Sequence, residues 1–111
     1  MEKILKYQNL ITDLLEGYAR VWSDDPQIRF EVVFDVIRRH YLLLCIGWNG
    51  DDYTHHIAAH LSIQNNKIWI HKNATDQSIA EALVEQGVPK SDIVLGMQPP
   101  AYRQFTEYAA A

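Results

Sequence analysis

Several features that define common protein classes are missing from this sequence. Its 111 residues include one cysteine, Cys45, which excludes an internal disulfide and fits a reducing, cytoplasmic setting. No apolar run approaches the roughly 20 residues that a membrane-spanning helix needs. Segment 1–18 carries acidic side chains within its apolar pattern, so we do not expect a secretory signal. These absences predict a cytoplasmic protein without a membrane anchor.

Positive charge is also scarce. Lysine and arginine number 10 against 14 aspartate and glutamate residues, giving a net charge of −4 and a pI of about 5.6. The basic residues are scattered, and only Arg38 and Arg39 are adjacent. Proteins that bind duplex DNA through its phosphates carry a positive surplus on one face. We therefore expect no strong direct DNA binding by this chain.

Signatures of catalysis are absent as well. Segment 67–100, the most tightly patterned part of the sequence, has no nucleophile, phosphate-binding loop or metal-ligand signature. Cys45 has no evident positive group to stabilise a thiolate. Glu31 and Asp35 lie four residues apart on one expected strand, where nothing would give them the different acidities of a general acid and a general base. The residues predict a binding or regulatory protein rather than an enzyme.

The composition is that of one globular domain over residues 1–111. Hydrophobic residues make up 48% of the chain, and we find no repeat, low-complexity tract or flexible linker. Apolar side chains recur at helical spacing over residues 3–22, which predicts an amphipathic helix. The segment 23–26 should end this helix, because Pro26 cannot continue it.

Four strands are expected after the helix, at 29–36, 40–48, 53–64 and 67–72. Asn49-Gly50 is a strong hairpin signal, and Asn65-Asn66 suits a two-residue turn because asparagine tolerates positive φ. These turns predict an antiparallel meander. The residues predicted to face its core are Phe30, Val32, Phe34, Val36, Leu42, Leu44, Ile46, Trp48, His55, Ile57, Ala59, Leu61, Ile63, Ile68 and Ile70.

The register and the cover of the sheet complete the predicted fold. Pairing Trp48 with Tyr53 and Gln64 with Lys67 puts the apolar sets on one face. The helix of residues 3–22 and a second helix over 76–86 are available to cover that face. The second helix should begin at Thr75-Asp76 and stop at Gly87 before Pro89. Residues 93–95 should be extended, and Pro99-Pro100 should begin a last helical turn. We predict a two-layer α+β domain: a four-stranded antiparallel meander in the order α-β-β-β-β-α, with the N- and C-terminal helices packed on one face.

An ordered set of short motifs runs through most of the chain and is densest from residue 67 to 106. Its members are Gly47-Trp48, 67–70, Thr75-Asp76, Ile79-Ala80, Leu83, 87–90, 92–96, Pro99, Arg103 and Thr106. In this set the chain resembles the XisI family, the fdxN element excision controlling factors of cyanobacteria.

The resemblance implies a small α+β protein without catalytic residues that helps a site-specific recombinase to excise a DNA element. It implies action through XisH, an endonuclease-like partner, with the DNA chemistry carried by XisH and the recombinase. On the residues alone, other functions stay open: a metal-dependent enzyme using the outer sheet face, a direct DNA-binding protein, and a homodimeric binding module unrelated to excision.

Histidines on the outer face of the sheet are the residues best suited to bind a metal ion. In the predicted register His60 lies opposite His71, with Cβ atoms about 4.5–5.5 Å apart. His56 pairs with Cys45, and Tyr41 pairs with His60 from the other side. Neutral imidazoles can bind zinc, but His56 and His60 should lie roughly 13 Å apart along the strand. We therefore name His60 and His71 as metal candidates and expect no compact three-ligand site and no cofactor.

Two segments are candidates for a protein partner. Apolar and aromatic side chains are expected on the outer face of the sheet, where they would be exposed, namely Val33, Tyr41, Leu43, Ala58 and Trp69. The C-terminal segment places anchor-type side chains after two prolines. We predict that the partner, or a second copy of the chain, contacts Tyr41, Trp69, Pro99, Pro100, Tyr102 and Arg103.

Overall fold

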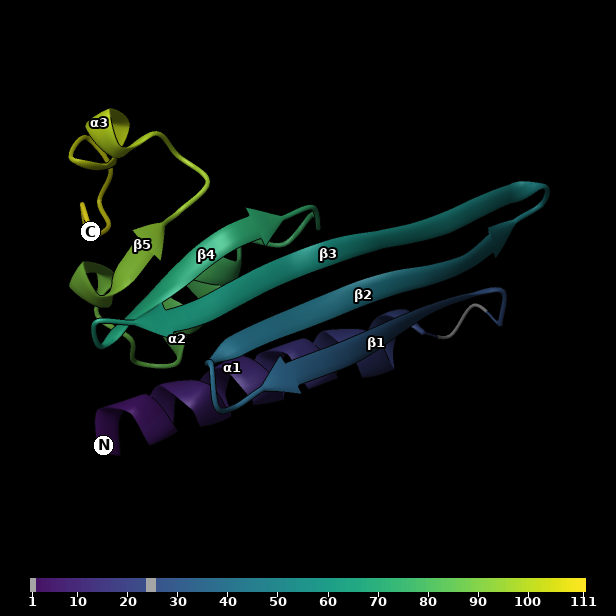
Figure 1. Ribbon diagram of the computed structural model, residues 1–111, viewed down its shortest axis with the longest axis horizontal. Coiled ribbons are helices and arrows are strands. Elements are labelled where there is room, and N and C mark those ends of the chain that lie inside the picture. The colour runs from purple at the N-terminus through teal and green to yellow at the C-terminus, as the bar shows by residue number, and fades with distance from the viewer. Residues whose placement is uncertain (1, 24–25) are drawn as a thin grey trace.

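A computed structural model describes residues 2–23 and 26–111 and contains a five-stranded sheet with two helices on one face (Figure 1). The elements in chain order are α1 (Glu2–Trp22), β1 (Ile28–Asp35), β2 (His40–Asn49), β3 (Asp52–Gln64), β4 (Lys67–Asn73), α2 (Ile79–Glu85), η1 (Lys90–Asp92), β5 (Ile93–Leu95) and α3 (Pro100–Arg103). The predicted α+β class is confirmed. Within the described ranges, no helix combines the length and the apolar character needed to cross a bilayer.

The first helix forms as its periodicity predicts. Tyr7, Ile11 and Leu15 are buried at intervals of four residues, which places them on one side of α1. After the helix, the Ser23 hydroxyl accepts a hydrogen bond from the Phe30 backbone N–H at 2.9 Å, which ties the helix end to β1. Asp24 and Asp25, in the predicted terminating segment, lie outside the described residues.

The meander of β1 to β4 is antiparallel, and both predicted hairpin registers are confirmed. Trp48 pairs with Tyr53 across the first hairpin, and Gln64 pairs with Lys67 across the second. Asn65 and Asn66 have φ values of 54° and 61°, the positive values that a tight two-residue turn requires. Local turn chemistry thus sets the order of these strands.

The predicted number of strands is wrong, because β5 adds a fifth strand parallel to β4. Ile68 pairs with Ile93, and Ile70 pairs with Leu95. The chain reaches this edge through α2, since parallel neighbours need a crossover connection. The extended geometry of residues 93–95 was predictable, but no local signal could identify β4 as their partner.

One face of the sheet, the covered face, packs against α1 and α2, which lie behind the strands in Figure 1. The predicted placement of both helices on one face is confirmed. The opposite face, here called the open face, carries the C-terminal segment at its β4 end, where Arg103 lies over Trp69. The fully buried side chains of the core are nearly all aliphatic, and Ser62 is the one buried polar residue in the described part of the chain.

The orientation of β2 is opposite to the predicted one. Its buried residues, on the covered face, include Tyr41, Leu43 and Cys45. Its half-buried or exposed residues, on the open face, include Leu42, Leu44, Ile46 and Trp48. Because consecutive side chains of this strand are apolar on both faces, alternation could not distinguish the two orientations.

A β-bulge explains why the predicted orientation of β3 is correct over only part of the strand. Leu43 pairs with Ala59 while Leu44 pairs with Ile57, so Ala58 is an extra residue in β3. On the C-terminal side of this bulge, the predicted core positions Ala59, Leu61 and Ile63 are confirmed. Outside β2, the residues wrongly predicted to face the core are His55 and Ile57 in β3, and Val36 just after β1.

A glycine permits the close approach of β1 and β2 near the first hairpin. Gly47 has φ 154°, and a Cβ added to it would lie 2.1 Å from the Gln27 carbonyl oxygen. That same oxygen accepts a hydrogen bond from the Trp48 N–H at 3.0 Å. Any larger residue at position 47 would push the two strands apart. Beyond this point the β2–β3 hairpin extends past the end of α1 (Figure 1).

The start of α2 differs from the prediction by about one turn. Ser78 caps the helix, and its hydroxyl accepts a hydrogen bond from the Glu81 N–H at 3.3 Å. Thr75 and Asp76 belong to the preceding turn, where the Asn73 side chain accepts from the Thr75 N–H at 3.0 Å. The predicted stop at Gly87 is confirmed, with φ 100°.

Asp92 connects the C-terminal half of the chain to α1. Its carboxylate accepts a hydrogen bond from the Tyr7 hydroxyl and lies 2.8 Å from the Lys3 ammonium. Burial alone would raise the pKa of Asp92, but the bonds from Lys3 and Tyr7 outweigh it and hold the pKa below its ordinary range. Burial and the nearby carboxylate raise the pKa of Tyr7, so this phenol stays protonated and donates.

Candidate functional site

Three histidines from three neighbouring strands meet on the open face, and we call them the histidine cluster. His40 begins β2, His60 lies in β3, and His71 lies near the end of β4. His40 Nδ1 is 3.0 Å from His60 Nε2, and the ring centroids of His60 and His71 are 4.7 Å apart. One ring nitrogen of each residue lies within 4.8 Å of the others. This is the densest group of potential metal ligands in the described chain.

The cluster depends on a second β-bulge. Ile70 pairs with Leu61, whereas Lys72 pairs with His60, so His71 is an extra residue in β4. The predicted direct pairing of His60 with His71 is therefore wrong in register, although the two rings are close. The pairing of Tyr41 with His60 is also wrong.

The corrected neighbours of Tyr41 and His60 are Leu61 and Leu42. Cys45 pairs with His56, as predicted. His40 was not among the predicted candidates, because its proximity to His60 appears only when the first bulge is counted. Two single-residue irregularities thus decide which histidines meet.

Hydrogen bonds orient the His71 ring. Ser62 Oγ lies 2.7 Å from His71 Nε2, and the Gln64 amide donates to the same oxygen at 3.1 Å. Ser62 Oγ has two acceptor lone pairs, so besides the Gln64 hydrogen bond it can accept one from a proton on His71 Nε2. A neutral His71 ring in this tautomer keeps the lone pair of Nδ1 free.

Electrostatics also favour neutral rings. Burial lowers the pKa of His60, and the nearby His71 and His40 lower it further. Burial likewise lowers the pKa of His71, with added contributions from His40 and Arg103. The rings of His60 and His71 are therefore neutral at neutral pH.

The C-terminal segment closes over one side of the cluster. The Arg103 guanidinium lies 5.2 Å from the centre of the Trp69 ring, a cation–π geometry. It also donates to the carbonyl oxygens of Gly96 at 3.2 Å and Gln98 at 3.1 Å. A Cβ on Gly96 would lie 3.3 Å from His71 Nδ1, so the chain passes close to this histidine. Arg103 thus holds the segment in place.

This segment exposes a group of apolar and aromatic side chains, which we call the C-terminal surface. It consists of Met97, Pro99, Pro100, Tyr102 and Phe105. Phe105 is 80% exposed and Tyr102 is 61% exposed. The predicted partner residues Pro99, Pro100 and Tyr102 therefore lie together at the surface. Arg103 and Trp69 lie half-buried beneath them, where they support this surface.

The predicted exposure of Tyr41 is wrong. The side chain is fully buried in the core, and its hydroxyl donates to Gln8 Oε1 of α1 at 3.0 Å. Leu43 and Ala58, expected on the same outer face, are buried as well, whereas Val33 is exposed. The orientation of β2 accounts for the burial of Tyr41 and Leu43, and the bulge in β3 accounts for the burial of Ala58.

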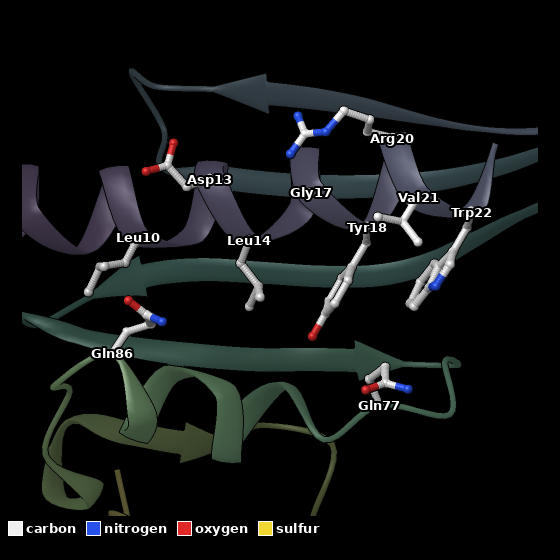
Figure 2. A pocket seen from close by; sticks show the side chains of 10 residues that line it. All are labelled: Leu10, Asp13, Leu14, Gly17, Tyr18, Arg20, Val21, Trp22, Gln77 and Gln86. Atoms are coloured by element: carbon white, nitrogen blue, oxygen red, sulfur yellow. The ribbon is translucent and has the colours of Figure 1, made fainter. Parts of the chain in front are cut away.

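A groove of about 590 Å³ lies between α1 and α2, on the side opposite the histidine cluster. Figure 2 shows Leu10, Leu14, Tyr18 and Trp22 pointing from α1 toward α2. Gln77 and Gln86 line its other side. None of the lining residues is a cysteine, serine or histidine, so the groove suits contact with an apolar segment rather than covalent chemistry.

Cys45 is unsuited to nucleophilic chemistry. Its side chain is buried, and burial raises the pKa of its thiol. A protonated thiol is a poor nucleophile and a poor metal ligand. The sequence likewise showed no positive group beside Cys45 that would stabilise a thiolate.

Comparison with known proteins gives consistent matches over the full fold. The sequence profile described as XisI protein matches residues 1–110. The crystal structure of a XisI-like protein from Anabaena variabilis ATCC 29413 is similar with a TM-score of 0.91 and 40% identity, covering 97% of this chain and 99% of that one. The fdxN element excision controlling factor XisI from the same organism gives a TM-score of 0.83 and 34% identity, covering 98% and 99%. Among curated proteins, none matches significantly.

Proposed function

Because this chain belongs to the XisI family, we propose that it is a non-enzymatic factor that controls excision of a DNA element. It acts in the cytoplasm by binding an endonuclease-like partner of the XisH type, which works with a site-specific recombinase. The observation that carries this proposal is the similarity, over 98% of the chain, to a protein named as an fdxN element excision controlling factor.

The absence of an enzymatic role is supported by the chemistry of the reactive groups. The buried thiol of Cys45 stays protonated. With a net charge of −4, the chain is also poorly suited to hold DNA by itself. A partner that cuts DNA carries positive charge where it binds phosphates, so an acidic regulator is complementary in sign to such a partner.

The C-terminal surface is the proposed docking site for the partner. Tyr102 and Phe105 are large and exposed; Tyr102 lies on α3 and Phe105 just after it, and Arg103 ties this turn to Gly96 and to Trp69 of β4. Aromatic side chains held in this way lose little conformational entropy on binding and are typical anchors of protein interfaces. Trp69 supports the surface from below through its contact with Arg103.

The test is capture of a purified XisH-type protein by the immobilised chain, with affinity measured by calorimetry. We expect the double variant Tyr102→Ala/Phe105→Ala to bind at least about tenfold more weakly, as loss of interface anchors typically causes. The matched control is Trp48→Ala/Tyr53→Ala, which removes two exposed aromatic side chains from the β2–β3 hairpin. This control should bind like the unmodified chain.

The experiment tests the docking surface and the identity of the partner separately. Wild-type affinity in the Tyr102/Phe105 variant would place docking elsewhere, with the groove between α1 and α2 as the next surface to vary. Failure of the unmodified chain to bind any XisH-type protein would overturn the partner itself. Light scattering on the same samples measures whether the chain forms the predicted homodimer.

A further inference from the structure

We propose that His40, His60 and His71 form a binding site for one divalent transition-metal ion, with zinc as the ion that fits best. The site joins β2, β3 and β4 on the open face. This inference is independent of the excision-control proposal, because it requires only the cluster itself.

The spacing of the ligand atoms is close to what zinc requires. With Zn–N bonds of about 2.0–2.1 Å, nitrogens around a tetrahedral ion lie roughly 3.3 Å apart. His40 Nδ1 and His60 Nε2 are already 3.0 Å apart, and all three ligand atoms fall within 4.8 Å of one another. Small rotations of half-buried imidazole rings are enough to bring the third nitrogen into the same sphere.

Three neighbouring strands of the sheet hold the three imidazole rings close together. Strands of one sheet hold neighbouring side chains at fixed distances, and the bulge at His71 turns an extra ring toward the open face. Ser62, which is fully buried, bonds to the His71 ring from below. Such outer-shell hydrogen bonds are typical of metal-ligating histidines, because they fix the orientation of the ring.

The ligand type selects the class of ion. The cluster offers imidazole nitrogens and no carboxylate, and the burial that lowers the pKa of His60 and His71 keeps these rings neutral. Magnesium and calcium prefer oxygen ligands, whereas zinc, copper and nickel bind imidazole well. Arg103 adds positive charge nearby, so binding rests on the metal–nitrogen bonds rather than on charge attraction.

Three protein ligands leave a fourth tetrahedral position free. A zinc site with three histidines and an open position can take a water molecule or a ligand from another molecule. The segment at Gly96 passes close to His71, so it borders this site.

The experiment is titration of the untagged, chelator-treated chain with Zn²⁺ by calorimetry, and with Co²⁺ by visible absorption. We expect one ion per chain and the intense absorption of four-coordinate cobalt, with no displacement by excess Mg²⁺. His40→Gln, His60→Gln and His71→Gln should each weaken Zn²⁺ binding at least about tenfold, since even loss of an outer-shell partner commonly costs 10–100-fold.

Two histidines outside the cluster provide matched controls. His55 and His56 lie exposed on β3, and replacing either with glutamine should leave Zn²⁺ affinity unchanged. The proposal is overturned if the unmodified chain binds no Zn²⁺, or if the His55 or His56 variants lose affinity as much as the cluster variants. Circular dichroism checks that each variant is folded, and the cobalt spectrum of the unmodified chain tests nitrogen coordination without any substitution.

Discussion

The two faces of the sheet differ sharply in their chemistry. The covered face buries aliphatic side chains such as Leu61, Ile68 and Ile70 against the helices. The open face carries His60, His71 and other half-buried polar and aromatic groups. A face that only needed to contact water would gain nothing from converging imidazoles. The covered face therefore provides stability, and the open face carries the groups on which the proposed metal site depends.

The histidines of the open face meet where β3 and β4 each contain a β-bulge. The extra residue Ala58 in β3 is two residues from His60, and the extra residue His71 in β4 is itself a member of the histidine cluster. Bulges redirect side chains and often occur near functional sites. A regular sheet with the same sequence would place these side chains differently.

The largest expected effect is on the covered face. Leu61→Ala removes a fully buried side chain, and large-to-small changes of this kind lower the free energy of unfolding by about 2–5 kcal/mol. The matched change on the open face is Leu44→Ala, at a half-buried leucine. It should cost less than half as much, because part of its side chain already contacts water. Urea denaturation of both variants measures the difference.

Equal losses from the two leucine variants would contradict the comparison. That result would mean that the open face is buried in solution, for example by a second copy of the chain. Repeating the measurement over a range of protein concentrations would separate these cases, because the stability of a dimer depends on concentration.

An intermediate effect is expected at Asp92, which links η1 to α1 on the covered side. Asp92→Asn keeps an acceptor for Tyr7 but loses the charge that pairs with Lys3. We expect the free energy of unfolding to fall by about 1–2 kcal/mol at neutral pH, since hydrogen bonds to charged groups are stronger than neutral ones. Thermal and urea denaturation measure this loss.

The same residue predicts a pH dependence. Its folded-state pKa lies below the ordinary value of 3.8, so its stabilisation is complete above that value. The stabilisation is lost as the pH falls through the folded-state pKa. The difference between the unmodified chain and Asp92→Asn should therefore be constant near neutrality and shrink below about pH 4. A difference that grew on acidification would contradict the assigned bonds.

The smallest global effect is expected on the open face, at Arg103. Arg103→Ala removes two hydrogen bonds to backbone carbonyls and the contact with Trp69. We expect a loss of about 1 kcal/mol or less in global stability, because the side chain is partly exposed. Hydrogen exchange should nevertheless accelerate in residues 96–108. Arg103→Lys is the control that keeps the charge but not the forked geometry, and it should also show faster exchange there.

Local chemistry predicted much of the fold. The apolar periodicity of α1, the two asparagine-based hairpin turns and the stop at Gly87 all depend on neighbours in sequence, and all three are confirmed. The orientation of β2 was wrong, because Leu42 and Leu43 are equally apolar and both faces of this strand look like a core. The parallel pairing of β5 was missed, because it joins segments that no turn connects.

The candidate sites show the same division. The exposed aromatic residues after Pro99-Pro100 were predictable from composition, because prolines and aromatic side chains in one segment suggest an ordered surface. The placement of Tyr41 in the core and of His40 beside His60 was not predictable. Tyr41 depends on which face of β2 is buried, and the proximity of His40 to His60 depends on the extra residue in β3.

The sequence by itself determined that this protein is an acidic α+β chain whose motifs resemble the XisI family. Composition, helical periodicity and turn residues carry that information, and each acts over a few residues. The tertiary structure decided which face of β2 is buried, where the fifth strand pairs and which three histidines meet. A single bulged residue reverses every side chain beyond it relative to its neighbour, so these features follow from the register between strands and not from any one strand alone.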